Sequence, residues 1–147
     1  IKKNLELNRL NLEKNWVYKM DTLEFFKYAN RPEQSAGPSH QVPGGLSLRK
    51  RLMFDIIIID PPTFSRNKGK TFSVQNDHPQ LINAALELLN PGGFILFSNN
   101  KQDFRLHKDK LNPCRIQNIQ NKTIPPDFCQ PNTHHAFLIK QAEPQRG

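Results

Sequence analysis

The sequence predicts an α/β fold built on a mostly parallel sheet. Two apolar runs, Ile56–Ile59 and Phe94–Phe97, lack the alternation of a half-exposed strand, and such runs are typical of strands that are buried on both faces. Apolar residues at helical spacing occupy 79–89, between the two runs. A strand, a helix and a second strand in this order indicate a parallel pair joined by a right-handed crossover.

The N-terminal part of the chain is expected to hold two helices and one short strand. A helical pattern runs over 1–11 without a preceding N-cap residue, which predicts a fragment or a processed form of a longer protein. Aromatic and β-branched residues predict a strand over 16–20. Asp21 precedes a short amphipathic helix over 23–29. Residues 31–53 are rich in proline, glycine and basic residues, and we expect a surface insertion there.

The remaining sequence alternates predicted strands and helices. A strand over Phe54–Asp60 ends at Pro61 and Pro62, which have no N–H group to continue a sheet. A polar, basic loop is expected over 63–72. The last two strands follow one another without a helix, so we expect an antiparallel pair at the C-terminal end of the sheet. The other predicted elements are a helix over 79–89 that ends at Asn90–Gly93, a strand over 94–97, a helix over 101–111, and strands over 115–119 and 136–139.

Composition excludes several classes of protein. The chain has 21 Lys and Arg against 13 Asp and Glu, a formal charge of +8, and a basic surface of this kind favours a polyanionic partner. No apolar run approaches the roughly 20 residues of a membrane span. The two cysteines, Cys114 and Cys129, predict reduced thiols of a cytoplasmic protein and not a disulfide framework.

Candidate functional residues follow the predicted strands, where ligands bind in open α/β sheets. The carbonyl groups of Pro61 and Pro62 can accept hydrogen bonds from an amino group of a base, and Phe64 can stack on a planar ring. Basic residues gather in the loops that follow two of these strand ends and are expected to meet phosphates. The polar residues at the predicted strand ends are Asp21, Asp60, Asn99 and Asn100, and the basic ones beyond them include Arg66, Lys68, Lys70, Lys101 and Arg105.

Each of these residues also has a purely structural interpretation. Asp21 can act as a helix N-cap, and an Asp-Pro-Pro sequence can be an ordinary turn. Asn99 and Asn100 can satisfy backbone groups of a turn, and the basic residues can form a solvated surface. The five histidines lack the spacing of metal ligands, so no metal site is predicted.

Two longer strings carry a family resemblance: Phe54–Ser65, which reads FDIIIIDPPTFS, and Gly92–Lys101, which reads GGFILFSNNK. Together they resemble the class I S-adenosylmethionine-dependent methyltransferases. The similarity is closer to the carboxy-terminal, K-type domain of the large-subunit ribosomal RNA methyltransferases K/L. Shorter matches are Asp77-His78, Phe104-Arg105, Lys122-Thr123, Asp127-Phe128 and His134.

The resemblance implies a Rossmann-like sheet and methyl transfer from S-adenosylmethionine to N7 of a guanine in large-subunit (23S) ribosomal RNA. By the same resemblance, Asp21 and Thr22 bind the adenine of the cofactor, and Asp60, Pro61 and Pro62 border the methyl donor and the target base. Phe64 then stacks on the base. The residues implied to contact the substrate are Phe64, Asn99, Asn100, Lys101 and Arg105.

The family's first strand, its glycine-rich cofactor loop and its ribose-binding acid would precede Ile1. We therefore expect residues 1–147 to be a partial catalytic domain, truncated at its N-terminus. Two alternatives stay open. One is a cofactor-free remnant that binds RNA through its +8 charge. The other is a methyltransferase for an exocyclic amine, although Thr63 separates Asp-Pro-Pro from the aromatic Phe64 here.

The expected mechanism needs little proton chemistry. Guanine N7 has a lone pair and no proton to lose, so alignment with the methyl–sulfonium bond would supply most of the catalysis, with Asp60 as an orienting group. Methylation of cytosine C5 would need a thiolate nucleophile. Related cytosine enzymes carry that cysteine after the strand where Ser98 stands, and no cysteine occurs there.

Overall fold

The computed structural model describes residues 2–10, 15, 18–31, 51–67, 70–124 and 134–142. The chain divides into two compact units, Ile1–Arg51 and Leu52–Gly147. Most of the predicted insertion lies outside the described residues, as does Cys129. In the part of the chain that is described, no helix is both long and apolar enough to cross a membrane.

The first unit contains two helices, α1 (Lys2–Leu7) and α2 (Thr22–Ala29). α2 confirms the short helix predicted over 23–29, while α1 is shorter than the helix predicted over 1–11. The strand predicted over 16–20 is not formed by its described residues, 18–20. Instead, the Tyr18 ring packs 5.1 Å from the Phe25 ring of α2, and burial raises the pKa of Tyr18. The aromatic ring of Tyr18 therefore contributes to packing against α2 and not to a strand.

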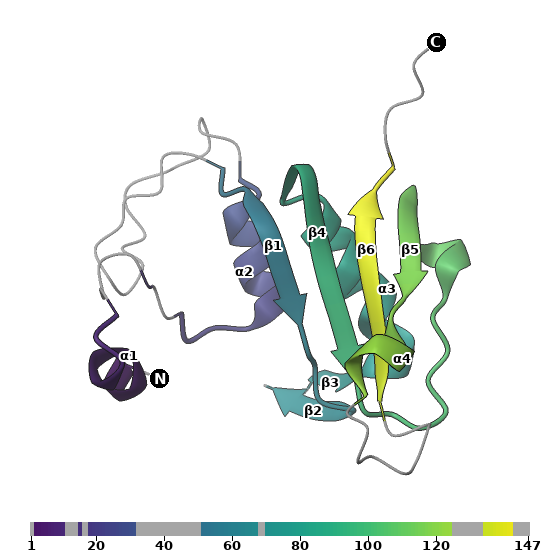
Figure 1. Ribbon diagram of the computed structural model, residues 1–147, viewed down its shortest axis with the longest axis horizontal. Coiled ribbons are helices and arrows are strands. Elements are labelled where there is room, and N and C mark those ends of the chain that lie inside the picture. Colours follow the sequence, from purple (N-terminus) through teal and green to yellow (C-terminus); the bar gives the residue numbers. More distant parts are fainter. Residues whose placement is uncertain are drawn as a thin grey trace. The chain divides into compact units, whose positions relative to one another are not determined.

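The second unit is built on a four-stranded sheet in the order β1-β4-β6-β5 (Figure 1). β1 runs parallel to β4, while β6 runs antiparallel to both β4 and β5. The parallel pair and the C-terminal antiparallel pair both confirm the predicted fold class. The strands are β1 (Phe54–Ile59), β4 (Leu89–Asn99), β5 (Cys114–Asn118) and β6 (His135–Gln141).

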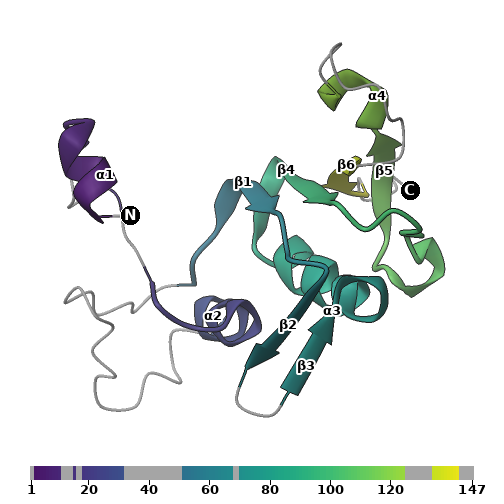
Figure 2. The same cartoon turned by 90° about the horizontal axis from the view of Figure 1, so that it is seen from below.

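The connection between β1 and β4 differs from the prediction. The expected loop over 63–72 is a hairpin of β2 (Phe64–Asn67) and β3 (Lys70–Ser73), whose strands lie side by side in Figure 2. α3 (Val74–Leu86) then begins five residues before the predicted start at Pro79. Its first turn is fixed by Asp77, whose carboxylate accepts a hydrogen bond from the Ser73 N–H at 2.7 Å.

The helix predicted over 101–111 is wrong. Residues 101–107 take an irregular path, and only a short 3₁₀ turn, η2 (Lys108–Lys110), follows them. The reason is tertiary: side chains of α3 hold this segment by its backbone, as described below, and the segment has no apolar stripe that would favour a helix. The short helix α4 (Gln120–Thr123) was not predicted.

The core lies between α3 and one face of the sheet. Ile57 and Ile59 of β1 are buried and are in register with Ile95 and Phe97 of β4. Phe97 also contacts the ring of His78 in α3, 6.2 Å away, so α3 covers this face. The buried apolar residues of the helix and of its neighbouring strands include Val74, Leu81, Ile82, Ala85, Leu86, Leu89, Ile95, Phe97, Ala136 and Ile139.

The expectation that β1 is buried on both faces is wrong. Ile56 and Ile58 are 55% and 70% exposed, and they lie on the face opposite Ile57 and Ile59. Along a strand, successive side chains alternate between faces, and α3 covers only one. A run of isoleucines therefore identifies the strand correctly but does not report how many of its faces are covered.

β1 and β4 approach closely at Gly93. A Cβ atom at this position would lie 2.8 Å from the carbonyl oxygen of Asp55 and 3.2 Å from that of Phe54. Gly92, just before it, has a φ of +84° and open space around its Cβ position. The two glycines therefore serve different needs, one for backbone approach and one for a left-handed turn.

We expect Gly93→Ala to destabilise the protein by about 2–3 kcal/mol, because the added methyl group must displace backbone atoms of β1. Chemical denaturation would measure the change. Gly92→Ala is the matched control, in which only the left-handed backbone conformation is penalised; it should cost about 1 kcal/mol, with the loss in Gly93→Ala larger by about 1 kcal/mol or more. Equal losses for the two variants would contradict the close approach at Gly93.

Candidate active site

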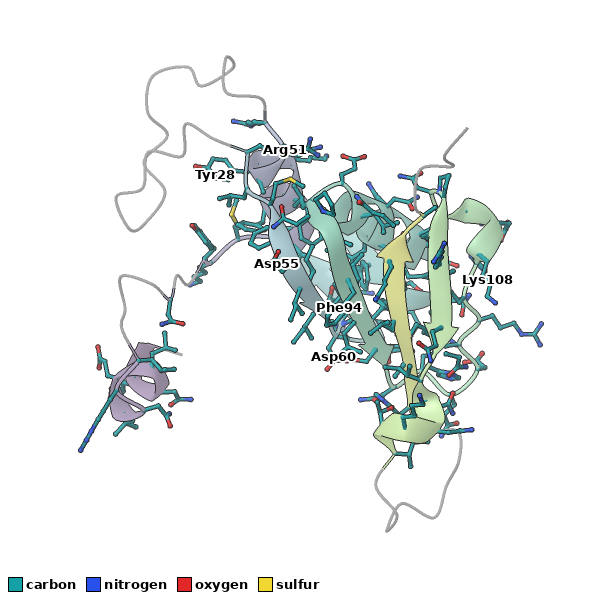
Figure 3. The ribbon with its side chains drawn as sticks, turned by 45° about the horizontal axis from the view of Figure 1, so that its top comes forward. Tyr28, Arg51, Asp55, Asp60, Phe94 and Lys108 are labelled. Carbon is teal, nitrogen blue, oxygen red and sulfur yellow. The ribbon has the colours of Figure 1, made fainter. Side chains whose placement is uncertain are left out.

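The candidate site is built on the carboxyl ends of the parallel pair β1 and β4. Asp60 directly follows β1 and is exposed. Its Oδ1 accepts a hydrogen bond from the Oγ of Ser98, on β4, at 2.7 Å. Asp55 lies at the other end of β1 and accepts from Asn90 at 2.8 Å (Figure 3). The structure thus brings the Asp-Pro-Pro turn and the end of β4 together, as the sequence predicted.

The turn after Asp60 leads straight into the hairpin. Pro61 is half-buried and Pro62 is exposed. Neither has an N–H group, so the polar groups that this turn offers are carbonyl oxygens and the Asp60 carboxylate. Phe64, at the start of β2, is 63% exposed. A large aromatic ring open to solvent, four residues after an exposed carboxylate, is suited to binding a planar ligand.

Asn99 and Asn100 differ sharply in exposure. Asn99 is 0% exposed, and its Oδ1 accepts a hydrogen bond from the Lys101 N–H at 3.1 Å. Its buried Nδ2 has no hydrogen-bond partner among the described residues. Asn100 is exposed. Asn99 therefore stabilises the turn through its side-chain oxygen, which was the structural interpretation of this residue. Asn100 is accessible to a ligand.

The predicted basic residues of this segment are also unequal. The Lys101 ammonium group forms an ion pair with Asp103, and this hydrogen bond lowers the pKa of the Asp103 carboxyl. The Arg105 side chain is exposed, whereas its backbone is fixed to α3. Arg105 is therefore the more accessible of the two cations.

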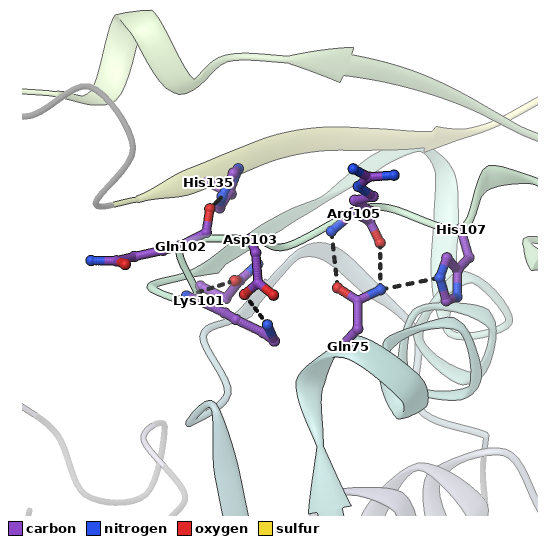
Figure 4. A network of polar contacts seen from close by, with 8 residues as sticks. Gln75, Lys101, Gln102, Asp103, Arg105, His107 and His135 are labelled. Atoms are coloured by element: carbon purple, nitrogen blue, oxygen red, sulfur yellow. Dashed lines mark hydrogen bonds and ion pairs between the residues drawn. The ribbon is translucent and has the colours of Figure 1, made fainter.

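Sequence reasoning missed the residue that fixes the Arg105 backbone, Gln75 of α3. Its side-chain amide accepts a hydrogen bond from the Arg105 N–H at 2.9 Å and donates one to the Arg105 carbonyl at 3.0 Å. The same amide nitrogen lies 3.1 Å from Nε2 of His107 (Figure 4). A polar residue in the first turn of a helix gives no sequence signal of such a long-range contact.

His78 is the second missed residue, although Asp77-His78 was among the matches that carried the resemblance. It is 0% exposed. Its Nδ1 lies 2.8 Å from the Val74 carbonyl, which can only accept, so Nδ1 carries the proton. Its Nε2 accepts a hydrogen bond from the His107 N–H at 3.0 Å. The ring is therefore neutral and links α3 to the segment after β4.

Burial, above all, lowers the pKa of His78, and the nearby His107 and Lys110 lower it further, against the effect of hydrogen bonds to the backbone. The rings of Phe97 and Phe104 lie 6.2 and 4.8 Å from His78 and leave little room for water. A proton on Nε2 would face the His107 N–H and break the link between α3 and the segment. The neutral form is thus a structural requirement.

Asp21 and Thr22 lie in the first unit. Asp21 is exposed, and its Oδ1 accepts hydrogen bonds from the N–H groups of Leu23 and Glu24, at 2.9 and 3.2 Å. It therefore caps α2, whose first residue is Thr22. Both bonds use the same oxygen, so Oδ2 stays available to a ligand. The cofactor role of the two residues remains a prediction.

Metal and thiol chemistry find no support in the described residues. They contain no group of three or more His, Cys, Asp or Glu side chains that could hold a metal ion. Cys114 lies half-buried in β5, away from the end of β4, and burial raises the pKa of its thiol. A thiol of this kind is a poor nucleophile.

Two curated relatives, both named ribosomal RNA large subunit methyltransferase K/L, resemble the chain. The protein of Shewanella pealeana is 36% identical over 146 residues, which cover 96% of this chain and 18% of the relative. That of Shewanella sediminis is 44% identical over 95 residues, or 61% of this chain and 13% of the relative. The chain thus spans less than a fifth of the length of the curated relatives it matches. No family model matches it.

Among solved structures, the chain resembles a protein assigned as a methyltransferase and crystallised with SAH. The TM-score is 0.67 and the sequence identity 29%, and the match covers 95% of this chain and 35% of the other. The likeness in fold therefore extends over nearly the whole sequence.

We expect the free energy of unfolding to fall as the pH drops below about 6.5, the ordinary pKa of histidine. The pKa of His78 is lower in the folded protein, so the unfolded chain binds more protons in this range and acid favours it. Denaturation at a series of pH values would measure the slope. It should be smaller in His78→Gln and unchanged in the control His134→Gln; an unaltered slope in His78→Gln would contradict this account.

Proposed function

We propose that the protein methylates large-subunit (23S) ribosomal RNA in the cytoplasm. The proposal is supported by the sequence similarity to the K/L methyltransferases and by the likeness in fold to a methyltransferase crystallised with SAH. The acceptor we propose is N7 of a guanine. The observation that carries the proposal is the junction of Asp60 with Ser98, 2.7 Å apart, at the carboxyl ends of two parallel strands.

The exposed groups at this junction suit a base. Asp60 uses Oδ1 to accept from Ser98 and remains exposed, so Oδ2 can accept a hydrogen bond from an N–H group of guanine. The carbonyl groups of Pro61 and Pro62 can accept further hydrogen bonds from an exocyclic amine. These contacts would fix the plane of the base and the direction of N7.

S-adenosylmethionine, when bound, would supply the electrophilic methyl group. In the first unit, Asp21 and Thr22 would bind its adenine, since the free Oδ2 of the helix cap at Asp21 can accept a hydrogen bond from an adenine amino group. In the second unit, Asp60 would border its methyl group. Because N7 loses no proton, the residues of this site need not remove one. Their task is to align N7 with the methyl group and to exclude water. Alignment of the reacting atoms can by itself give a large rate advantage.

The residues of the segment after β4 have separate tasks in this proposal. Asn100 and Arg105, which are exposed, would contact the RNA. Asn99 would fix the turn through Lys101, and Lys101 itself is held by Asp103. In this way, residues 1–147 would supply the base-binding part of a catalytic domain, with 31–53 as an insertion of it.

We expect the catalytic domain, extended upstream of Ile1 in its reading frame and incubated with labelled S-adenosylmethionine and undermodified large-subunit RNA, to produce 7-methylguanosine, identified by nucleoside mass spectrometry. Asp60→Ala should lower kcat/KM by about 100-fold, the cost of a misplacement of roughly 1 Å at the reacting centre. Asp55→Ala is the matched control, since it removes a carboxylate from the opposite end of the same strand, and it should retain activity.

Other products would select between the alternatives. N2-methylguanosine or another N-methylated amine would keep the methyltransferase and replace N7 by an exocyclic amine as the acceptor. RNA binding without transfer and without binding of S-adenosylmethionine would favour an RNA-binding module. Equal activity in Asp60→Ala and the wild-type protein would contradict the role assigned to Asp60.

A further inference from the structure

The β2–β3 hairpin is a second candidate for contact with RNA. It begins four residues after Asp60 and lies beyond the carboxyl ends of β1 and β4 (Figure 1). Its base is closed by a hydrogen bond from the Val74 N–H to the Thr63 carbonyl, at 3.1 Å, and by that from the Ser73 N–H to Asp77, at 2.7 Å. The hairpin is therefore firmly joined to the candidate site and to α3.

One face of the hairpin combines an aromatic ring with a cation. Phe64 and Arg66 are two residues apart in β2 and hence share a face, roughly 7 Å from each other along the strand. Thr71 pairs with Arg66 across the hairpin and shares that face as well. Phe64 is 63% exposed, and Arg66 and Thr71 are exposed too. A ring, a guanidinium group and a hydroxyl group are thus presented to solvent side by side.

All charged residues in and around the hairpin, over 61–76, are basic. Between Asp60 and Asp77 the sequence contains Arg66 and two lysines but no Asp or Glu. The carboxylate of Asp77 is engaged by the Ser73 N–H. An RNA strand offers a negative phosphate and a flat base in each nucleotide, and proteins bind it with cationic surfaces and aromatic stacking platforms. The hairpin face meets both requirements.

We propose that this face of the hairpin binds single-stranded RNA next to the methylated nucleotide, with Arg66 on a neighbouring phosphate. Phe64 then stacks on a flanking base, and not on the target base as the resemblance implied. Phe64 stands on an open face, which suits a sequence-tolerant stack. The target base, in contrast, would lie at Asp60, unstacked from its neighbours. The proposal rests on the proposed function for its choice of RNA and extends it to a second contact surface.

The test is a titration of the full chain with a fluorescein-labelled, single-stranded oligoribonucleotide at several salt concentrations, read by anisotropy. Arg66→Gln should reduce the slope of log K against log salt by about 0.7, the loss of one phosphate contact. Phe64→Ala should weaken binding by about 5- to 150-fold, the range for loss of one stacked base, with an unchanged slope. Phe64→Tyr, which keeps an aromatic ring, should bind like the wild-type protein.

Lys140→Gln is the matched control for charge, because Lys140 is an exposed cation of β6 outside the proposed surface. A slope that changes equally in Arg66→Gln and Lys140→Gln would overturn the proposal, as would tight binding by Phe64→Ala. Circular dichroism of each variant would verify that the fold is kept, and Phe64→Tyr tests the ring even if Phe64→Ala fails to fold.

The two proposals can fail separately. If the wild-type protein methylates ribosomal RNA but both hairpin variants bind RNA normally, the hairpin inference is wrong and the function stands. If the variants lose RNA binding as expected but no methyl transfer occurs, the hairpin surface stands and the methyltransferase assignment is wrong.

Discussion

The parallel ladder between β1 and β4 is the constraint on which the rest of the second unit depends. At one end, Gly93 of β4 has no side chain, so its backbone can lie close to the Asp55 carbonyl of β1. At the other end, the same register brings Ser98 to Asp60. A shift of one residue would reverse every side chain of β1 and expose Ile57 and Ile59. The core and the site are therefore set by a single pairing.

The segment after β4 obtains its shape from α3 and not from regular structure of its own. Gln75 holds Arg105 by two backbone hydrogen bonds, and His78 holds His107 by another. Each of these side chains lies in the first turns of α3, so the position of the helix and that of the segment are coupled. A displacement of α3 would move both the segment after β4, with its exposed Asn100 and Arg105, and the hairpin that precedes the helix.

Helical spacing of apolar residues predicted α2 and α3, and uninterrupted apolar runs predicted β1 and β4. The same patterns could not reveal that β1 is covered on one face, since an isoleucine reads alike whether buried or exposed. The hairpin and the irregular path of 101–107 were missed because polar sequences adopt the conformation that distant partners impose. That the carboxyl ends of β1 and β4 meet was predicted by strand order, whereas the Asp60–Ser98 hydrogen bond, the role of Gln75 and the tautomer of His78 could be recognised only in the structure.

The exposed isoleucines of β1 have a consequence for the behaviour of the chain in concentrated solution. β1 is an outer strand of the four-stranded sheet that the structure describes, and Ile56 and Ile58 are open to solvent on one of its faces. Strands of this kind can template the pairing of further chains, and a formal charge of +8 opposes such pairing by mutual repulsion. Since added salt weakens that repulsion, colloidal stability should decline as ionic strength rises, and low-salt, dilute conditions favour the monomer.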